Sequence, residues 1–464
     1  MSSSSTGTLF RPRLVSPSGR PQDEVPSRSR ISSLDIARGL VMVLMAIDHV
    51  RVYSGVPAGG PAPAIFFTRW VTHFVAPGFA FFAGTGAYLY GCKIGDRSKL
   101  AKFLATRGAF LLLLELTIIR IAWTFNFDFR HYLLAGVIWM LGWCMVLMAG
   151  LLWFPVRAIL AFGISVICLH NVLDYYMPLI GPKLSESSWA WVAQILYFGG
   201  PIPLGQNGPE LQVLYSIIPW IGVMACGYAF GRVMELPEAA RRRYCVGLGG
   251  TAVVLFLILR GFDLYGDPRP WNHAPRRVAT ALRQRAPSST STQSAPATSA
   301  KPAQSPSSSP APSPNTTPAP PRASHPGMNP VLRMLNTAKY PASLSFLLMT
   351  LGPLLLFVPL TEHLPRFITG WLRTFGRVPL FYYLLHIPLI HGLALCVSLI
   401  RTPSATWWLF MNHPMSPPPP PPGYTWPLAL LYVVWGFAIV LLYFPCRWYA
   451  DLKARSRNKW LSYL

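Results

Sequence analysis

Apolar runs long enough to cross a bilayer recur along most of the chain, and this feature constrains the fold more than any other. After residue 33, ten segments each hold about 20 mainly apolar residues, the length that a helix needs to span the hydrocarbon core. Because a lipid-exposed backbone must satisfy its own hydrogen bonds, all ten are expected to be helical. The sequence therefore predicts an all-α, polytopic membrane helix bundle of about ten transmembrane helices, at 34–53, 64–91, 103–124, 131–153, 156–178, 211–232, 244–261, 341–361, 375–400 and 426–447.

The composition excludes an ordinary soluble enzyme. Only 12% of the residues are charged and 52% are hydrophobic, whereas soluble chains carry about 25% charged residues. A net charge of +24 would suit a nucleic-acid partner, but the lysines and arginines lie in clusters between the apolar runs, as in the loops of membrane proteins. No nucleic acid is therefore expected. The seven scattered cysteines contain no CxxC motif and predict neither a disulfide framework nor a metal site.

The basic clusters predict the orientation of the helices. They precede the first segment, follow the second, open the fifth, follow the sixth, separate the eighth from the ninth, and close the chain. Every second connection is thus basic, so both termini should be cytoplasmic. The connection 262–340 breaks the pattern because it should be external yet holds several arginines, although long loops escape the rule.

Composition also divides the chain into domains. Residues 1–30 are expected to form a disordered basic tail, and 31–275 the first part of the membrane domain with spans one to seven. Residues 276–327 should be a disordered, Ser/Pro-rich external insertion that does no chemistry. Residues 328–447 complete the membrane domain with spans eight to ten, and 448–464 form a basic cytoplasmic tail. The two halves show no similarity, so the inverted repeat of many transporters finds no support.

The first apolar segment holds the densest set of ionisable residues, each a functional hypothesis because charge is costly inside a membrane. Arg38 and His49 are eleven residues apart, so on a helix they share one face, about 16 Å apart. Asp35 can pair with Arg38 at i,i+3, and Asp48 adjoins the histidine. In the alternative interpretation, Arg38 only sets the orientation and His49 is an interfacial residue beside Arg51.

Other polar residues interrupt the later segments. Arg69 and His73 share a face at i,i+4, and His386 lies at mid-membrane depth in the ninth segment. Glu115 lies inside the third segment, where a buried carboxylate must pair or stay neutral. Arg107 belongs to the basic stretch 93–107 before it. His73, Glu115 and His386 each have a purely structural alternative, as packed or paired polar side chains. No HExxH motif occurs, so no metal is predicted.

Several blocks together resemble one known family. They are similar to bacterial membrane proteins related to the catalytic domain of heparan-α-glucosaminide N-acetyltransferase. The resemblance covers about 31–275 and 328–447. Its blocks are ISSLDIARGLVMVLMAIDHVR, TRWVTHFVAPGFAFFAGTGAYL, IIPWIGVMACGYAFG, YGDPRPW with LNTAKYPASLSFLLMTLGP, and FGRVPLFYYLLHIPLIH.

This resemblance implies a function. The family looks like part of a wider group of transmembrane acyltransferases that includes the acyltransferase-3 family, in which an arginine and a histidine eleven residues later recur and the histidine is regarded as catalytic. Arg38 and His49 match that spacing. The lysosomal enzyme instead has asparagine in the region of Asp48–His49 and a histidine in the loop that follows. The corresponding loop Ser54–Pro63 here has none, so the assignment of His49 rests on the acyltransferase-3 pattern.

We therefore expect a membrane-integral acyltransferase of the bacterial inner membrane. It would move an acyl group, expected to be acetyl, from cytoplasmic acyl-CoA to a carbohydrate or other envelope acceptor at the outer face, without a metal. The expected catalytic residues are His49, Asp48, His73 and His386. The expected donor-binding residues are Arg38, Arg69 and Arg107.

Two other classes of function stay open, as does homo-oligomerisation. One is a transporter or proton-coupled carrier, with a relay of Glu115, His73 and His386. The other is a structural membrane protein of envelope assembly that uses the Pro-rich loop as its contact surface.

Overall fold

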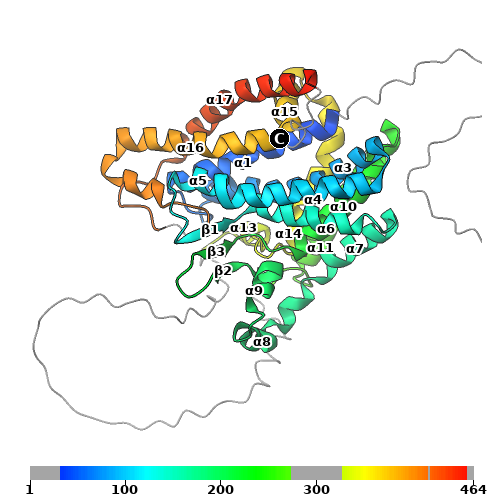
Figure 1. The fold of residues 1–464 in the computed structure, drawn as a ribbon, viewed down its shortest axis with the longest axis horizontal. Helices are drawn as coiled ribbons and strands as arrows, with labels where there is room; N and C mark the ends of the chain where they lie inside the picture. Colours follow the sequence, from blue (N-terminus) through cyan, green and yellow to red (C-terminus); the bar gives the residue numbers. More distant parts are fainter. Residues whose placement is uncertain (1–31, 273–326, 416–417, 457–464) are drawn as a thin grey trace, which may run out of the picture.

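The computed structural model describes residues 32–272, 327–415 and 418–456. The N-terminal tail and the insertion that the sequence predicts to be disordered lie almost entirely outside these ranges, so that prediction stays untested. The chain is mostly helical, and Figure 1 shows long helices lying side by side. In chain order the α-helices are α1 (Ser32–Ser54), α2 (Pro63–Trp70), α3 (Val75–Ile94), α4 (Arg97–Leu114), α5 (Arg120–Thr124), α6 (Val137–Leu151), α7 (Val156–Leu169), α8 (Val172–Ser185), α9 (Ala190–Ala193), α10 (Ile218–Met234), α11 (Glu238–Gly261), α13 (Pro330–Leu335), α14 (Leu344–Leu360), α15 (Arg366–Arg377), α16 (Pro379–Arg401) and α17 (Leu428–Arg455). Shorter 3-10 or π turns are η1 (Val71–Phe74), η2 (Glu115–Ile119), η3 (Gln194–Phe198), η4 (Thr361–His363) and η5 (Pro403–Phe410).

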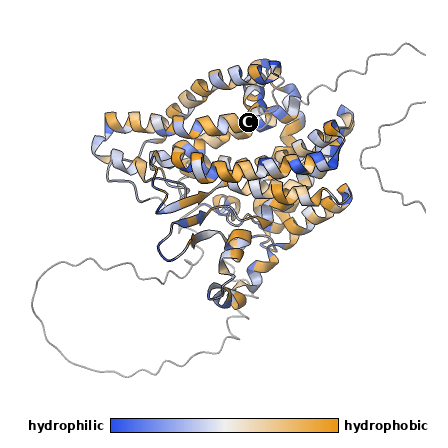
Figure 2. Cartoon of the chain, viewed as in Figure 1, coloured by the Kyte–Doolittle hydropathy of each residue, from blue (hydrophilic) through white to orange (hydrophobic). Residues whose placement is uncertain are grey.

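The helices have the length and composition of a membrane protein. Within the described ranges, four helical segments are individually long and apolar enough to cross a bilayer, namely Glu238–Gly261, Leu344–His363, Pro379–Arg401 and Leu428–Arg455. A fifth candidate is the pair α7 and α8, bent by 62°. Figure 2 shows apolar residues predominating along the helices. The helical membrane character is therefore confirmed, whereas the ten-span topology stays a prediction.

Two of the apolar segments do not begin as helices. The segment expected at 131–153 opens with β1 (Tyr132–Ala135), and the one expected at 211–232 overlaps β3 (Glu210–Val213). With β2 (Gly200–Pro203) they form a sheet of order β1-β3-β2, in which β1 is parallel and β2 antiparallel to β3. The expectation that every segment is wholly helical was wrong here, because paired strands also satisfy their backbone groups.

Glycines allow the helices around α1 and α3 to pack closely. A Cβ on Gly84 would lie 2.0 Å from the carbonyl oxygen of Met224, so α3 and α10 meet at backbone distance. A Cβ on Gly39 of α1 would lie 1.8 Å from the carbonyl oxygen of Leu372 in α15. Helix α1 also contacts α3, α14, α16 and α17. It is thus a central element, and polar residues on it reach several neighbours.

Candidate active site

A pair of histidines joins α1 to α16. The Nδ1 atom of His49 lies 2.6 Å from Nε2 of His386, and the two rings stack with centroids 4.7 Å apart. Trp123 of α5 meets the His49 ring edge-on at 4.8 Å. His386 is fully buried, and His49 is partly buried. The geometry therefore links the two histidines into one unit.

The hydrogen bonds around this pair fix its tautomers. Nδ1 of His386 faces the carbonyl oxygens of Tyr383 at 2.7 Å and Tyr382 at 3.2 Å. Carbonyl oxygens only accept, so this nitrogen carries the proton and Nε2 of His386 is the acceptor in the neutral ring. His49 consequently donates from Nδ1, and its Nε2 keeps the lone pair. In this pair, His49 Nε2 is the atom able to act as base or nucleophile.

A large cavity opens beside the N-terminal half of α1. It has a volume of about 1690 Å³, and Arg38 and Arg107 both line it. Most of its charged lining residues are basic, and they come from segments that the sequence predicts to be cytoplasmic. These further cations are Lys93, Arg241, Arg366, Arg373, Arg377 and Lys453. We call it the basic cavity.

Arg38 is held in a defined position on the wall of the basic cavity. Its Nη2 donates to the carbonyl oxygen of Phe82 at 2.6 Å, and Nη1 lies 3.9 Å from the carboxylate of Asp35. The guanidinium packs against Gly86 of α3, where a Cβ would come within 2.6 Å of Nη2. Glycine at this position therefore gives Arg38 its space.

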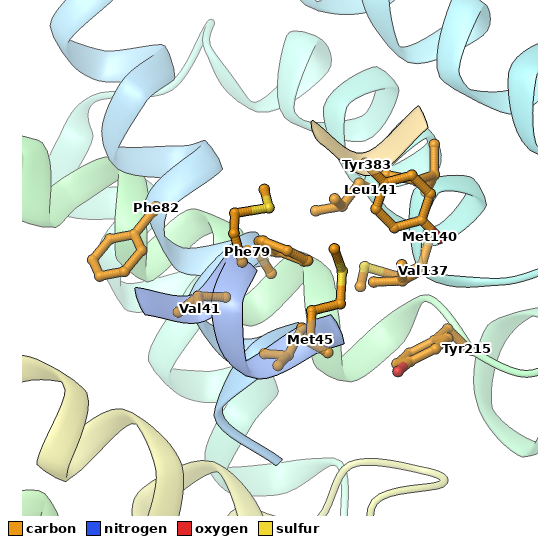
Figure 3. Packing of buried hydrophobic residues seen from close by; sticks show 14 of the residues in the cluster. Val41, Met45, Phe79, Phe82, Val137, Met140, Leu141, Tyr215 and Tyr383 are labelled. Atoms are coloured by element: carbon orange, nitrogen blue, oxygen red, sulfur yellow. The ribbon is translucent and has the colours of Figure 1, made fainter. Parts of the chain in front are cut away.

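The inner part of the cavity is apolar and ends near the histidine pair. Its lining includes Tyr383, whose ring packs edge-on against His386 with centroids 5.1 Å apart. Figure 3 shows Tyr383 and Leu141 in the same buried cluster as Phe79 and Met45. Neither His49 nor His386 lines the cavity. Tyr383 thus lines the basic cavity with one side and contacts the histidine pair with the other.

Asp48 and Arg69 lie together in a different place. Asp48 accepts from Nε of Arg51 at 2.9 Å and from Nη1 of Arg69 at 2.7 Å, so both carboxylate oxygens are engaged. Asp48 forms no hydrogen bond with His49 among the described residues, and Arg69 is not on the lining of the basic cavity. The structure therefore separates this ion pair from Arg38 and Arg107.

His73 and Glu115 do not join the histidine pair either. His73 is buried in η1 and meets Phe346 edge-on at 5.4 Å. Glu115 lies in the π turn η2 and accepts from the backbone N–H of Ile138 at 3.1 Å. Within the described parts of the chain, no hydrogen bond links Glu115, His73 and His386. In the described part of the chain these three side chains are therefore not joined by direct hydrogen bonds.

Two residues of this region were not found from the sequence. Trp123 is one of many aromatic residues in apolar helices, so nothing marked it. Lys339 could have been found from the sequence, because it is a single lysine directly before an apolar run. In the structure its side chain is only 6% exposed.

Where the structure describes the chain, no group of three or more His, Cys, Asp or Glu side chains could hold a metal ion.

Comparison with known protein families shows to which family the chain belongs. Residues 30–264, half of its length, match the family model described as heparan-alpha-glucosaminide N-acetyltransferase, catalytic. The chain belongs to this family. It is thus a member of a family of transmembrane N-acetyltransferases that use acetyl-CoA. A search of curated proteins finds no match. The matched range, 30–264, contains Arg38, His49 and Arg107. His386 and Lys339 lie outside this range.

Proposed function

We propose that the protein is an acyltransferase of the bacterial inner membrane. It would transfer an acetyl group from cytoplasmic acetyl-CoA to a carbohydrate or other envelope acceptor at the outer face. The observation that carries the proposal is the neutral His49–His386 pair, one side chain beyond the lining of a basic cavity. This proposal includes the predicted topology of ten spans with both termini cytoplasmic.

The basic cavity suits the donor in both charge and polarity. Coenzyme A combines phosphates with a long, uncharged arm. Arg38 and Arg107 would hold phosphate oxygens, for which the planar guanidinium is well shaped. The arm would follow the apolar lining made by Met42, Phe79 and Leu111. The thioester would then lie toward Tyr383 and the histidine pair.

The residues of the pair supply the proton transfers. As the acceptor amine or hydroxyl attacks the thioester carbonyl, His49 Nε2 takes its proton, and the imidazolium that forms keeps its Nδ1–H bond to His386. The acyl–sulfur bond breaks, the thiolate leaves with the electron pair, and the His49 imidazolium returns the proton to sulfur. His386 acts through His49 and is a positioning residue. A direct attack by His49 Nε2 on the thioester would instead make this histidine the acyl carrier.

The proposal is tested with His49→Ala in purified protein given radiolabelled acetyl-CoA and amino-sugar acceptors. We expect transfer to fall by 10²-fold or more, because general-base catalysis contributes about that much. The matched control is His391→Gln, which changes a buried histidine of α16 that stacks on Tyr53 and Phe125. Unchanged transfer by the His49 variant at normal expression would contradict the assignment. Label that is retained on the denatured wild-type chain and absent from the denatured His49 variant would identify His49 as the acyl carrier.

A further inference from the structure

A second group of charged residues surrounds the C-terminal half of α1, away from the end that lines the basic cavity. We call it the Lys339 cluster. It joins α1, α2, the loop before α10 and the loop before α14. Its members are Asp48, Arg51, Arg69, Tyr215, Lys339 and Tyr340.

The charges of this cluster do not balance. Its single carboxylate, Asp48, is engaged by Arg51 and Arg69 at 2.9 and 2.7 Å. Lys339 adds a third cation and forms no ion pair among the residues that the structure describes. Three cations against one carboxylate leave two positive charges in excess. Uncompensated charge in a buried place is costly, so the cluster has room for one or two negative charges.

Lys339 lies deepest in the cluster. Its side chain is 6% exposed, and its Nζ lies 5.9 and 5.3 Å from the ring centroids of Tyr215 and Tyr340. It interacts electrostatically with His49 as well as with Asp48. Cation–π contacts stabilise an ammonium only partly. They leave its charge available to a ligand beside His49.

The cluster can be reached from outside. Tyr340 is 39% exposed, and its hydroxyl lies 3.3 Å from that of Tyr215. The side chains of Asp48 and Arg69 are also partly exposed. Tyr340 donates its hydroxyl proton to Tyr215, so the Tyr215 hydroxyl keeps a proton that it can donate to a ligand. A neutral sugar ring would gain nothing from the excess charge, whereas an oxyanion would.

We propose that the Lys339 cluster is a binding subsite for an oxyanion group, a phosphate, sulfate or carboxylate, carried by the acceptor. Lys339 and Arg69 would contact this group and so present the acceptor nucleophile to His49. Lys339 is thus the specificity-determining residue. This inference rests on the proposed function. An anionic lipid headgroup has the same chemistry and is the alternative source of the oxyanion.

The ionisation of the cluster is consistent with this role. Burial lowers the pKa of the Lys339 ammonium. Burial alone would raise the pKa of the Tyr340 phenol, but the Lys339 ammonium and the Arg69 guanidinium hold it below its ordinary value of 10.0. The Lys339 shift thus arises mainly from burial, and the Tyr340 shift from the two neighbouring cations. A bound oxyanion would relieve the excess positive charge of the cluster.

The first test uses inorganic phosphate and does not depend on activity. The unfolding temperature of the purified full-length protein is measured with increasing phosphate at constant ionic strength. Lys339→Met removes the charge at similar length, and Lys339→Arg keeps it. The matched control is Lys99→Met, which removes an exposed lysine paired with Asp96. Independent sites stabilise additively, so the contribution of the basic cavity cancels between variants.

We expect Lys339→Met to bind phosphate at this site about tenfold more weakly, as the loss of one charge-assisted contact predicts. Its phosphate-induced rise in unfolding temperature should be smaller than in the wild type, whereas Lys339→Arg and Lys99→Met should show the full rise. An equal rise in Lys339→Met and the wild type would overturn the proposal.

The second test separates an acceptor from a lipid. Acetyl transfer to glucosamine and to glucosamine 6-phosphate is compared in neutral phosphatidylcholine vesicles. We expect a lower KM for the phosphorylated acceptor, and loss of this preference in Lys339→Met without a matching loss of kcat. Equal KM values, or activity that instead requires phosphatidylglycerol, would overturn the acceptor assignment. Failure of both sugars to react would count against the proposed function, while the phosphate measurement still decides the cluster.

Discussion

His49 and His386 are 337 residues apart in the chain and share one hydrogen bond, so each controls the protonation of the other. We expect His386→Leu to lower kcat by about 10²-fold, because His49 then loses the acceptor that fixes its tautomer and stabilises its imidazolium. The KM for acetyl-CoA should stay unchanged, since His386 does not line the basic cavity. His386→Gln offers an amide oxygen and should recover part of the rate. Steady-state kinetics measure both constants, and a rise in donor KM with unchanged kcat would contradict the positioning role.

At the scale of residues, the sequence predicts what lies along one helix better than what meets across helices. Arg38 and His49 both lie in α1, and a spacing of eleven residues puts them on one face of a regular helix. Adjacent residues point about 100° apart on a helix, so Asp48 faces away from His49. It reaches Arg51 one turn on, and Arg69 of α2. Periodicity carries no information on such cross-helix partners, and for the same reason it could not pair His49 with His386.

At the scale of elements, Arg38 depends on the close approach of α1 to α3. A Cβ on Gly86 would lie 2.6 Å from Nη2 of Arg38, so Gly86→Ala should displace the guanidinium. We expect the KM for acetyl-CoA to rise about tenfold, the loss of one charge-assisted contact, with little change in kcat. The control is Gly150→Ala at a helical position where the added Cβ meets nothing within 4 Å. An unchanged KM in correctly folded Gly86→Ala would show that Arg38 does not bind the donor.

Apolar runs predict the helical elements because membrane insertion depends on local composition. The places where the prediction failed need tertiary information. β1 pairs with β3, which lies more than 70 residues further along the chain, so the sheet could not be derived from either segment alone. The 62° bend between α7 and α8 coincides with His170 and Asn171, which bond the backbone of Ala342 and Leu344. From the sequence alone these two side chains look like the polar end of a helix. Only the position of α14 in the fold shows that they bind its N-terminal backbone.

At the scale of the whole molecule, buried hydrogen bonds join the segments on either side of the predicted insertion. Buried Arg260 donates to the carbonyl oxygens of Arg269 at 2.6 Å and Met334 at 3.1 Å. Buried Asp267 accepts from the backbone N–H of Ala338 at 2.8 Å and from the hydroxyl of Ser343 at 3.0 Å. The described contacts therefore join the two flanks directly to each other.

These contacts predict that the insertion and its flanks behave differently when changed. Replacing 280–322 by a short Gly/Ser linker should leave the unfolding temperature and acetyl transfer unchanged, because longer or shorter loops alter closure entropy only slightly. Asp267→Ala should destabilise the protein by about 2–4 kcal/mol, since it removes one of the two carboxylates beside buried Arg260 and leaves the Ala338 N–H and the Ser343 hydroxyl without their acceptor. Both variants are compared with the wild type by thermal unfolding in detergent and by transfer assays. A deletion that destabilises as much as Asp267→Ala would show that the insertion, and not the fastened flanks, holds α11 and α14 together.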